Sequence, residues 1–364
     1  MNRANPQRDG YGTIRTRKKA GLPAATVSVV VTFAAVAANI FLYFAFYLPN
    51  TSSVTTNDPG VGAKSNLSDG FPELERRGEI YSTPDVLRAP AGDPVLAGAG
   101  DIAVCGANGD DATAKLIEDM PNATVVTLGD HAFEDGTASE FADCYGPSWG
   151  RFKERTVPTV GNHEYQTPGA SGYFGYFGSA AGSTDKGYYS YDLGNWHVVS
   201  LNSMCGNAAS EYRQPGGCGP DSPMVTWLER DLASNPAACT LGTFHHPLFN
   251  SGNLGNHPNM KPIWDALYAA DADVVLNAHQ HAYERFAPQT PGGAGDQARG
   301  IRQFVVGTGG ASHEPFGTVQ SHSQVRNADT YGVIKLTLHP NGYDWQFVPE
   351  AGKTFTDSGT DECH

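Results

Sequence analysis

Several residues that commonly bind metal ions follow short apolar segments of this sequence. The group contains two aspartates, one asparagine and a set of histidines: Asp101, Asp130, Asn162, His163, His245, His279 and His281. Each lies just after a run that is typical of a buried strand. Because α/β proteins place ligand sites beyond the carboxyl ends of their strands, we expect these side chains to form a site at the strand ends.

The residue types indicate a pair of metal ions rather than a structural zinc. Carboxylate and amide oxygens combined with imidazoles suit borderline divalent or trivalent ions, whereas structural zinc sites are rich in cysteine. His279 and His281 are one residue apart in a bent turn, so they diverge and can serve different ions. Two ions about 3.5–4 Å apart clamp a phosphoryl group and activate a bridging water. Taken singly, a Gly-Asp pair is commonly only a turn or helix cap, so the prediction depends on the combination.

The segments around these residues predict the elements that must position them. Five strands are expected: Val95–Ala99, Val125–Leu128, Thr156–Val160, Cys239–Phe244 and Asp273–Leu276. Asp110–Asp119 has apolar residues at helical spacing and predicts the crossover of a βαβ unit. Ile301–Val306 and Val333–Leu338 are expected as strands of a second sheet. An α/β fold follows from this alternation.

Two other kinds of segment lie near these residues in the sequence. The glycine-rich run 307–310 lacks the lysine and Ser/Thr of a phosphate loop, which favours a tight turn. The aromatic segments Trp149–Phe152 and Tyr173–Phe177 predict surface loops near the mouth of the site, or side chains that simply pack its rim. Neither adds chemistry.

Five blocks of the sequence resemble, in order, the motifs of the calcineurin-like metallophosphoesterases: Gly100-Asp101, Gly129-Asp130, Gly161-Asn162-His163-Glu164, His245 and Ala278-His279-Gln280-His281. The run from His281 to Arg285 resembles the purple acid phosphatase branch, in particular its compact bacterial members. The resemblance covers residues 94–364. It implies a four-layer α/β/β/α sandwich with two metal ions at the strand ends.

The resemblance also implies a role for each matching residue. The first ion, commonly iron, would be held by Asp101, Asp130 and His281. Asp130 would bridge to the second ion, commonly zinc, manganese or iron, whose other ligands would be Asn162, His245 and His279. His163 would face the phosphate and protonate the leaving oxygen. His246 and His257 lie where the family places further phosphate-facing histidines, although their spacing differs.

Two positions depart from the family pattern. Purple acid phosphatases have a tyrosine ligand three residues after the bridging aspartate, and this chain has Phe133. Ala103 replaces a histidine that other metallophosphoesterases place two residues after the first aspartate. The first site therefore keeps three protein ligands, unless His131, beside the bridging aspartate, compensates.

The amino-terminal part predicts a membrane anchor. A basic tail, residues 1–23, precedes an apolar run, residues 24–48, that would span roughly 37 Å as a helix. This pattern favours an uncleaved signal anchor with an internal amino terminus over a cleaved signal peptide or a buried core helix. Residues 49–94 are rich in Thr, Ser, Asn, Gly and Pro and predict a stalk, which leaves 95–364 as the catalytic domain.

Cysteines and charge agree with an exported domain. All six cysteines lie beyond the apolar run, and we predict the pairs Cys105–Cys144, Cys205–Cys218 and Cys239–Cys363 among 15 possible pairings. Residues 1–48 carry a net charge of +5 within a total of −14, which leaves −19 on the remainder. That charge disfavours nucleic acid as a partner.

The sequence therefore predicts a membrane-tethered phosphatase with two metal ions (Fe, Zn or Mn) that hydrolyses small phosphomonoesters with an activated hydroxide. A phosphodiesterase or nucleotidase on the same site is the alternative within enzymes. A cell-surface binding protein on a decayed phosphatase scaffold is the alternative from another class, suggested by Phe133 and Ala103.

Overall fold

The computed structural model describes residues 92–184, 186–205 and 216–364, which belong to one compact unit, Gly78–His364. The predicted basic tail, the predicted anchor and nearly all of the predicted stalk lie outside the described residues. Within the described ranges, no helix is both long and apolar enough to cross a membrane.

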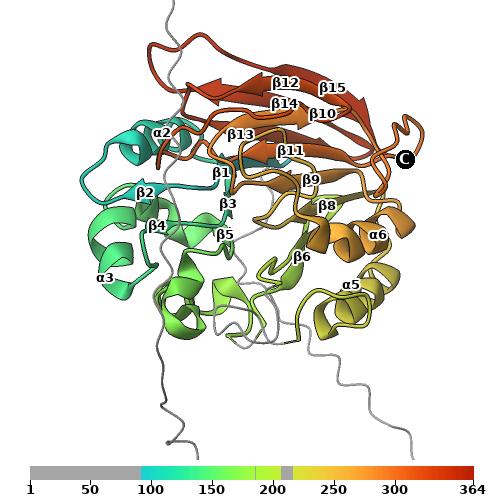
Figure 1. Cartoon of the computed structure of the whole chain (residues 1–364), viewed down its shortest axis with the longest axis horizontal. Coiled ribbons are helices and arrows are strands. Elements are labelled where there is room, and N and C mark those ends of the chain that lie inside the picture. The colour runs from blue at the N-terminus through green and yellow to red at the C-terminus, as the bar shows by residue number, and fades with distance from the viewer. Residues whose placement is uncertain (1–91, 185, 206–215) are drawn as a thin grey trace, which may run out of the picture. The chain divides into compact units, whose positions relative to one another are not determined.

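The first sheet has six strands in the order β15-β14-β13-β1-β3-β5 (Figure 1). Their bounds are β1 Val95–Ala99, β3 Thr124–Leu128, β5 Thr156–Thr159, β13 Gly332–His339, β14 Gly342–Pro349 and β15 Ser358–Glu362. β1, β3 and β5 are parallel, with Leu96 opposite Thr124 and Val125 opposite Thr156. The turns after these three strands therefore emerge at the same sheet edge.

The second sheet has seven strands in the order β12-β10-β11-β9-β8-β7-β6. Their bounds are β6 Tyr189–Leu193, β7 Trp196–Ser200, β8 Cys239–Thr243, β9 Val274–Asn277, β10 Tyr283–Phe286, β11 Arg302–Val306 and β12 Ser323–Asn327. β7, β8, β9 and β11 run parallel, and all their residues are buried, as expected for strands covered on both faces. A separate parallel pair joins β2 (Ala103–Val104) to β4 (Ala132–Phe133).

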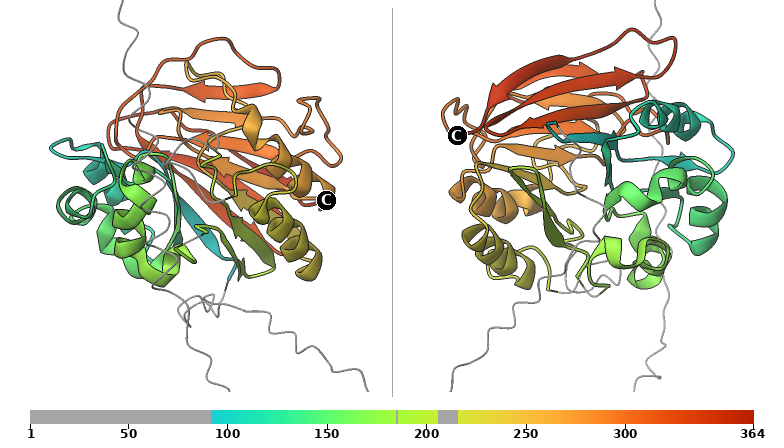
Figure 2. Two further views of the ribbon diagram at one scale, coloured as in Figure 1. Left: turned by 60° about the horizontal axis from the view of Figure 1, so that its bottom comes forward. Right: turned by 180° about the vertical axis from the view of Figure 1, so that it is seen from behind.

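Helices cover the two sheets from opposite sides (Figures 1 and 2). On the side of the first sheet lie α2 Gly109–Glu118, α3 Ala138–Glu140, η2 Phe141–Tyr145, η3 Trp149–Arg155 and α4 Ser171–Phe177. On the other side lie α5 Pro223–Ser234 and α6 Lys261–Ala269, which share a buried cluster with the second sheet. Helix α5 begins where the Ser222 hydroxyl accepts the N–H of Val225, with proline at its first position.

Large aromatic residues join the two sheets. The ring of Tyr283 in the second sheet lies 4.6 Å from that of Phe347 in the first, and Phe304 lies 5.8 Å from Trp345. All four belong to one buried cluster. The order helices, sheet, sheet, helices confirms the expected α/β sandwich.

One expectation about elements was wrong, and the structure decides between the two alternatives for the aromatic segments. β11 lies in the second sheet as expected, but β13 pairs antiparallel with β1 and belongs to the first. The aromatic segments do not form surface loops: Trp149 and Tyr173 are fully buried in η3 and α4. Aromatic side chains at helical spacing are core residues here because they fill the space between these short helices and the sheet.

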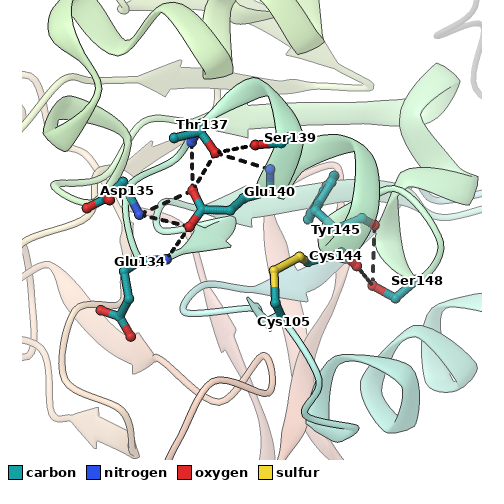
Figure 3. The surroundings of a disulfide bond; sticks show 9 residues. All are labelled: Cys105, Glu134, Asp135, Thr137, Ser139, Glu140, Cys144, Tyr145 and Ser148. Carbon is teal, nitrogen blue, oxygen red and sulfur yellow. Dashed lines mark hydrogen bonds between the residues drawn. A yellow bond between two sulfur atoms is a disulfide. The ribbon is translucent and has the colours of Figure 1, made fainter.

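All three predicted disulfides are confirmed: Cys105–Cys144, Cys205–Cys218 and Cys239–Cys363. The first attaches the segment after β2 to η2 (Figure 3). The third joins β8 to the end of the chain, 124 residues away. Among the described cysteines none is free.

Candidate metal centre

The six predicted metal ligands lie beyond the carboxyl ends of parallel strands from both sheets. Those in the first sheet follow β1, β3 and β5 and are Asp101, Asp130 and Asn162. Those in the second follow β8 and β9 and are His245, His279 and His281. Asp101, Asp130 and His279 have positive φ angles of 57°, 53° and 71°. Such a backbone costs a non-glycine residue about 1–3 kcal/mol and is concentrated at functional sites.

Asp130, His245 and His279 form the closest group of candidate ligands. Nε2 of His245 lies 3.0 Å from Oδ2 of Asp130 and 3.3 Å from Nδ1 of His279. One ligand atom from each residue lies within 4.8 Å of the other two. Ligand atoms of one ion are roughly 3–4 Å apart when each bond is near 2 Å. This spacing therefore suits a metal ion.

Asp101 and His281 lie beside this group. Oδ1 of Asp101 is 3.5 Å from Nε2 of His281 and 4.0 Å from Nε2 of His245. The other carboxylate oxygen accepts the backbone N–H of His279 at 2.8 Å. On its far side, Nδ1 of His281 contacts Oγ of Ser312 at 2.6 Å, which leaves Nε2 for the centre.

Two buried oxygens indicate that cations fit this centre. Oδ1 of Asp101 and Oδ1 of Asn162 have no hydrogen-bond partner among the described residues. Leaving a buried polar atom without a partner costs about 1–3 kcal/mol, and more when it is charged. Carboxylate and amide oxygens beside three imidazoles form a donor set that iron, zinc and manganese accept. The residues present therefore fit the expected pair of ions.

The histidines of the centre differ in their affinity for protons. Burial lowers the pKa of His245, but the neighbouring Asp130 and Asp101 outweigh it and raise the pKa to about 9. Burial is likewise outweighed at His281, where Asp101 raises the pKa to about 8. Burial and the nearby His246 hold the pKa of His279 well below its usual range. Metal ions and protons therefore compete for His245 and His281.

Glu164 joins two of the ligand-bearing turns, a role that sequence reasoning missed. Its buried carboxylate accepts the backbone N–H groups of Asp130, His131 and Gly161 at 3.0, 2.7 and 2.7 Å. Burial would raise the pKa of Glu164, but His131 and these hydrogen bonds lower it to about 2. The charged carboxylate thus holds the turns after β3 and β5 together.

Two glycines allow the aspartates to sit this close to the backbone. A Cβ added at Gly161 would lie 2.3 Å from Oδ1 of Asp130, and one at Gly307 would lie 2.4 Å from Oδ2 of Asp101. The turn containing Gly307 also donates the N–H of Ala311 to the carbonyl of Asp101 at 3.0 Å. The glycine run expected to be only a tight turn therefore supports a ligand.

His131 does not compensate for the missing tyrosine. It is fully buried, with one ring nitrogen 2.7 Å from Thr127 Oγ1 and the other 3.2 Å from Glu164. Phe133 lies at the centre instead, with its ring 4.4 Å from that of His163 and 5.8 Å from that of His281. A phenyl ring offers no ligand atom, so Phe133 contributes only an apolar wall.

His163 contacts the carboxylate of Asp130 from the side of the first sheet. Its backbone N–H donates to Oδ1 of Asp130 at 2.8 Å, and its Nε2 lies 3.9 Å from Oδ2 of the same residue. The side chain is partly exposed, at 24%. This position suits a group that faces a substrate beside the metal centre.

The structure brings His246 and His257 together with His279. Their ring centres lie 4.3 Å and 4.8 Å from that of His279 and 4.9 Å from each other. Burial is the main cause that lowers the pKa of His246 well below its usual range and that of His257 to about 4. Nδ1 of His246 contacts Oγ of Ser203 at 2.9 Å. Both imidazoles therefore favour the neutral form, in which they can serve as hydrogen-bond donors or metal ligands.

The fold and the centre define a metallophosphoesterase. The family model of the calcineurin-like phosphoesterases matches residues 94–283, so the chain belongs to that family. Purple acid phosphatase 23 of Arabidopsis thaliana is 32% identical over 176 residues, which cover 42% of this chain and 35% of that protein. The chain thus aligns with about a third of the length of that relative.

Two solved structures share the fold. A purple acid phosphatase from yellow lupin seeds (Lupinus luteus) matches with a TM-score of 0.57 and 18% identity, over 75% of this chain and 54% of that one. GAP50, described as the anchor in the inner membrane complex of Plasmodium, matches with a TM-score of 0.56 and 14% identity, over 75% and 89%. At these identities the likeness shows the fold alone.

Proposed function

We propose that this chain is a metal-dependent phosphatase that hydrolyses small phosphomonoesters. The observation that carries the proposal is the meeting of Asp101, Asp130, His245, His279 and His281 beyond the strand ends of the two sheets, where a buried carboxylate oxygen has no hydrogen-bond partner among the described residues. Membership of the calcineurin-like phosphoesterase family and the purple acid phosphatase relatives support the same conclusion.

The metal ions would be held by the predicted ligands, with Asp130 between them. When bound, two ions supply charge that neutralises the phosphoryl oxygens and lowers the pKa of a water molecule. The pair could be iron with zinc, manganese or a second iron, since the donor set contains both hard oxygens and imidazoles.

The remaining residues would bind the phosphate and deliver a proton. His163 lies beside Asp130 with its Nε2 toward the centre, and would donate the proton that the leaving oxygen needs. The neutral His246 and His257 would donate hydrogen bonds to phosphate oxygens from the side of His279. Phe133 would exclude water beside His163, because its ring covers that side of the centre.

Hydrolysis of p-nitrophenyl phosphate by the purified full-length chain, with metal analysis of the same sample, tests the proposal. We expect turnover that depends on bound metal and is lost in Asp130→Asn. Faster hydrolysis of bis(p-nitrophenyl) phosphate than of the monoester would favour a phosphodiesterase. Metal binding without turnover of either ester would favour the binding-protein alternative, which the anchor described in Plasmodium makes worth testing.

We further propose that the domain is exported and tethered to the membrane by residues 24–48. The apolar run after a basic tail and the pairing of all six cysteines support this placement. In cells, the protein should fractionate with membranes and be accessible to external protease. A soluble form that begins near Ala38 would show cleavage of the anchor, and six titratable thiols in the protein isolated from cells would contradict export.

A further inference from the structure

The loop between β4 and α3 contacts the carboxylate of Glu140, a residue without a predicted role (Figure 3). The same loop also contacts His163. The Glu140 carboxylate accepts the backbone N–H groups of Glu134 at 2.7 Å, Asp135 at 3.3 Å and Thr137 at 2.8 Å. It also accepts the Thr137 hydroxyl at 2.8 Å, and the same hydroxyl accepts the N–H of Glu140. One side chain therefore fixes the backbone of the whole loop.

The carbonyl of Glu134 faces the other way, toward His163. It lies 2.5 Å from Nδ1 of that histidine. A carbonyl can only accept a hydrogen bond, so this contact requires the proton on Nδ1. Nε2 is then the nitrogen directed at the metal centre, 3.9 Å from Oδ2 of Asp130.

Further contacts fix the loop against the segment that carries His163. The Thr167 hydroxyl donates to the carbonyl of Asp135 at 2.7 Å. Gly136, with a φ angle of 58°, packs so closely that an added Cβ would lie 2.6 Å from Cα of Glu164. The loop and the turn after β5 are therefore one packed unit, and a change in the loop backbone is transmitted to the His163 ring.

We propose that Glu140 is a positioning residue for His163: it holds the Glu134 carbonyl against Nδ1 and thereby aims Nε2 at the substrate. The proposal deepens the proposed function, because it rests on His163 as the proton donor to the leaving oxygen. The donating form is the imidazolium, whose Nδ1–H stays on the Glu134 carbonyl while the Nε2 proton passes to the leaving oxygen. It assigns a role in the reaction to a side chain that contacts neither the metal ligands nor the phosphate. If Glu140 only capped the three-residue helix α3, its replacement would not slow one substrate more than another.

The test compares Glu140→Gln with wild type on two substrates. Gln keeps the size of the side chain but replaces one accepting oxygen by an NH₂ group that repels the loop N–H donors. Release of an alkoxide needs a proton, whereas p-nitrophenolate leaves without one. We therefore expect kcat for an alkyl phosphate such as glycerol phosphate to fall roughly 10-fold or more, and kcat for p-nitrophenyl phosphate to fall less than about 3-fold.

Three controls separate positioning from damage to the fold. Glu118→Gln removes another partly exposed glutamate, which pairs with Lys115 at 2.7 Å, and should leave both rates unchanged. Metal content should be the same in all variants. When His163 is already replaced by Ala, Glu140→Gln should not lower kcat for the alkyl phosphate any further relative to p-nitrophenyl phosphate, since the two residues act as one unit.

A readout independent of activity decides the same question. Ring ¹⁵N spectra of His163 in its neutral form, assigned with His163→Ala, should show the Nδ1–H tautomer in wild type and its loss in Glu140→Gln. Three results would overturn the proposal. One is an equal loss of kcat on both substrates in Glu140→Gln. The others are a double variant in which the two substitutions lower kcat independently, and an unchanged His163 tautomer. If wild type hydrolyses neither ester, the proposed phosphatase function fails, and the spectra alone decide whether Glu140 positions His163.

Discussion

At the scale of single residues, Phe133 decides the character of the first metal site. Its ring lies beside His163 and His281, where the purple acid phosphatase branch has a tyrosine ligand. Because phenyl offers no anionic oxygen, positive charge at this site is less compensated and the preference for a trivalent ion is weaker. We therefore predict mixed occupancy by divalent ions.

Colour tests this consequence, because the purple of that branch arises from charge transfer between tyrosinate and ferric iron. We expect the iron-loaded wild-type protein to be colourless and Phe133→Tyr to gain visible absorption and hold the first ion more tightly. Absorption spectra and metal titrations of both proteins measure this. A purple wild-type protein would mean that another tyrosine reaches the iron and that the ligand assignment of the first site is wrong.

Asp130 and His163 contact each other but have different proposed roles. Asp130→Asn should remove most activity and weaken both ions, since its carboxylate lies 3.0 Å from Nε2 of His245 and is proposed to be shared by the two ions. His163→Ala should keep metal content and lower turnover by roughly 10²–10⁴, the usual contribution of a general acid. Measuring metal content together with kcat for both variants distinguishes the two roles. Equal metal loss in both variants would make His163 a ligand.

The motif residues of the centre could be predicted because each follows a strand in a recognisable order. The roles of Glu164 and Gly307 could not. Glu164 acts on backbone groups 33 and 34 residues away, and Gly307 matters only because the Asp101 side chain lies against it. Such roles depend on which segments the fold brings together, and local residue patterns carry no signal for that.

At the scale of elements, strand bounds were predictable and strand partners were not. The apolar runs that predicted β1, β3, β5, β8 and β9 agree with the structure within about two residues. β13 has equally clear periodicity, yet it pairs with β1, more than 200 residues earlier, rather than with β11. Pairing is set by the whole sandwich, because a strand can be buried equally well in either sheet.

The link between β7, β6 and α5 gives a pH-dependent prediction for stability. His197 is buried on β7 between Asp192 of β6 at 2.8 Å and Asp231 of α5 at 2.9 Å. Burial lowers the pKa of His197, but the hydrogen bonds to Asp231 and Asp192 outweigh it and raise the pKa. The unfolded value is about 6.5. The ion pairs therefore stabilise the fold fully below that pH, and the stabilisation declines as pH rises through the folded pKa.

His197→Gln should accordingly lower the free energy of unfolding by about 1–3 kcal/mol at pH 6 and by less at alkaline pH. Urea denaturation at both pH values measures the difference. His339→Gln serves as the control, because His339 also contacts two aspartates but is exposed, and its loss should be within about 1 kcal/mol. If the loss of unfolding free energy in His197→Gln grew with pH, the pKa of His197 would not be raised by its two aspartate partners.

At the scale of the whole molecule, the last residues of the chain fasten the two sheets to each other. We call residues 357–364 the C-terminal clasp. Asp357 accepts Tyr283 Oη and Arg285 Nε of β10, each at 2.7 Å. Asp361 pairs with Arg302 of β11 at 2.6 Å. Since β15 within the clasp belongs to the first sheet, these contacts and the disulfide to Cys239 join both sheets.

All three disulfides were predicted correctly, but only from the order of the cysteines along the chain. Six cysteines allow 15 pairings, and the sequence does not choose among them. What the sequence did not indicate is that one pair closes the sandwich. Cys363 reaches β8 because β15 lies at the edge of the first sheet and the chain then crosses to the second. That path is a property of the assembled molecule.

The clasp predicts an order of stability among the disulfides. The Cys239–Cys363 bond spans 124 residues and the Cys205–Cys218 bond spans 13, so the longer loop restricts the unfolded chain more, by about 2 kcal/mol in the chain-entropy description. Urea unfolding of the full chain should show Cys239→Ala/Cys363→Ala losing that much more stability than Cys205→Ala/Cys218→Ala. Both double variants remove two sulfur atoms, which makes them matched. An equal or reversed loss would mean that the ion pairs of Asp357 and Asp361 hold the clasp without the covalent bond.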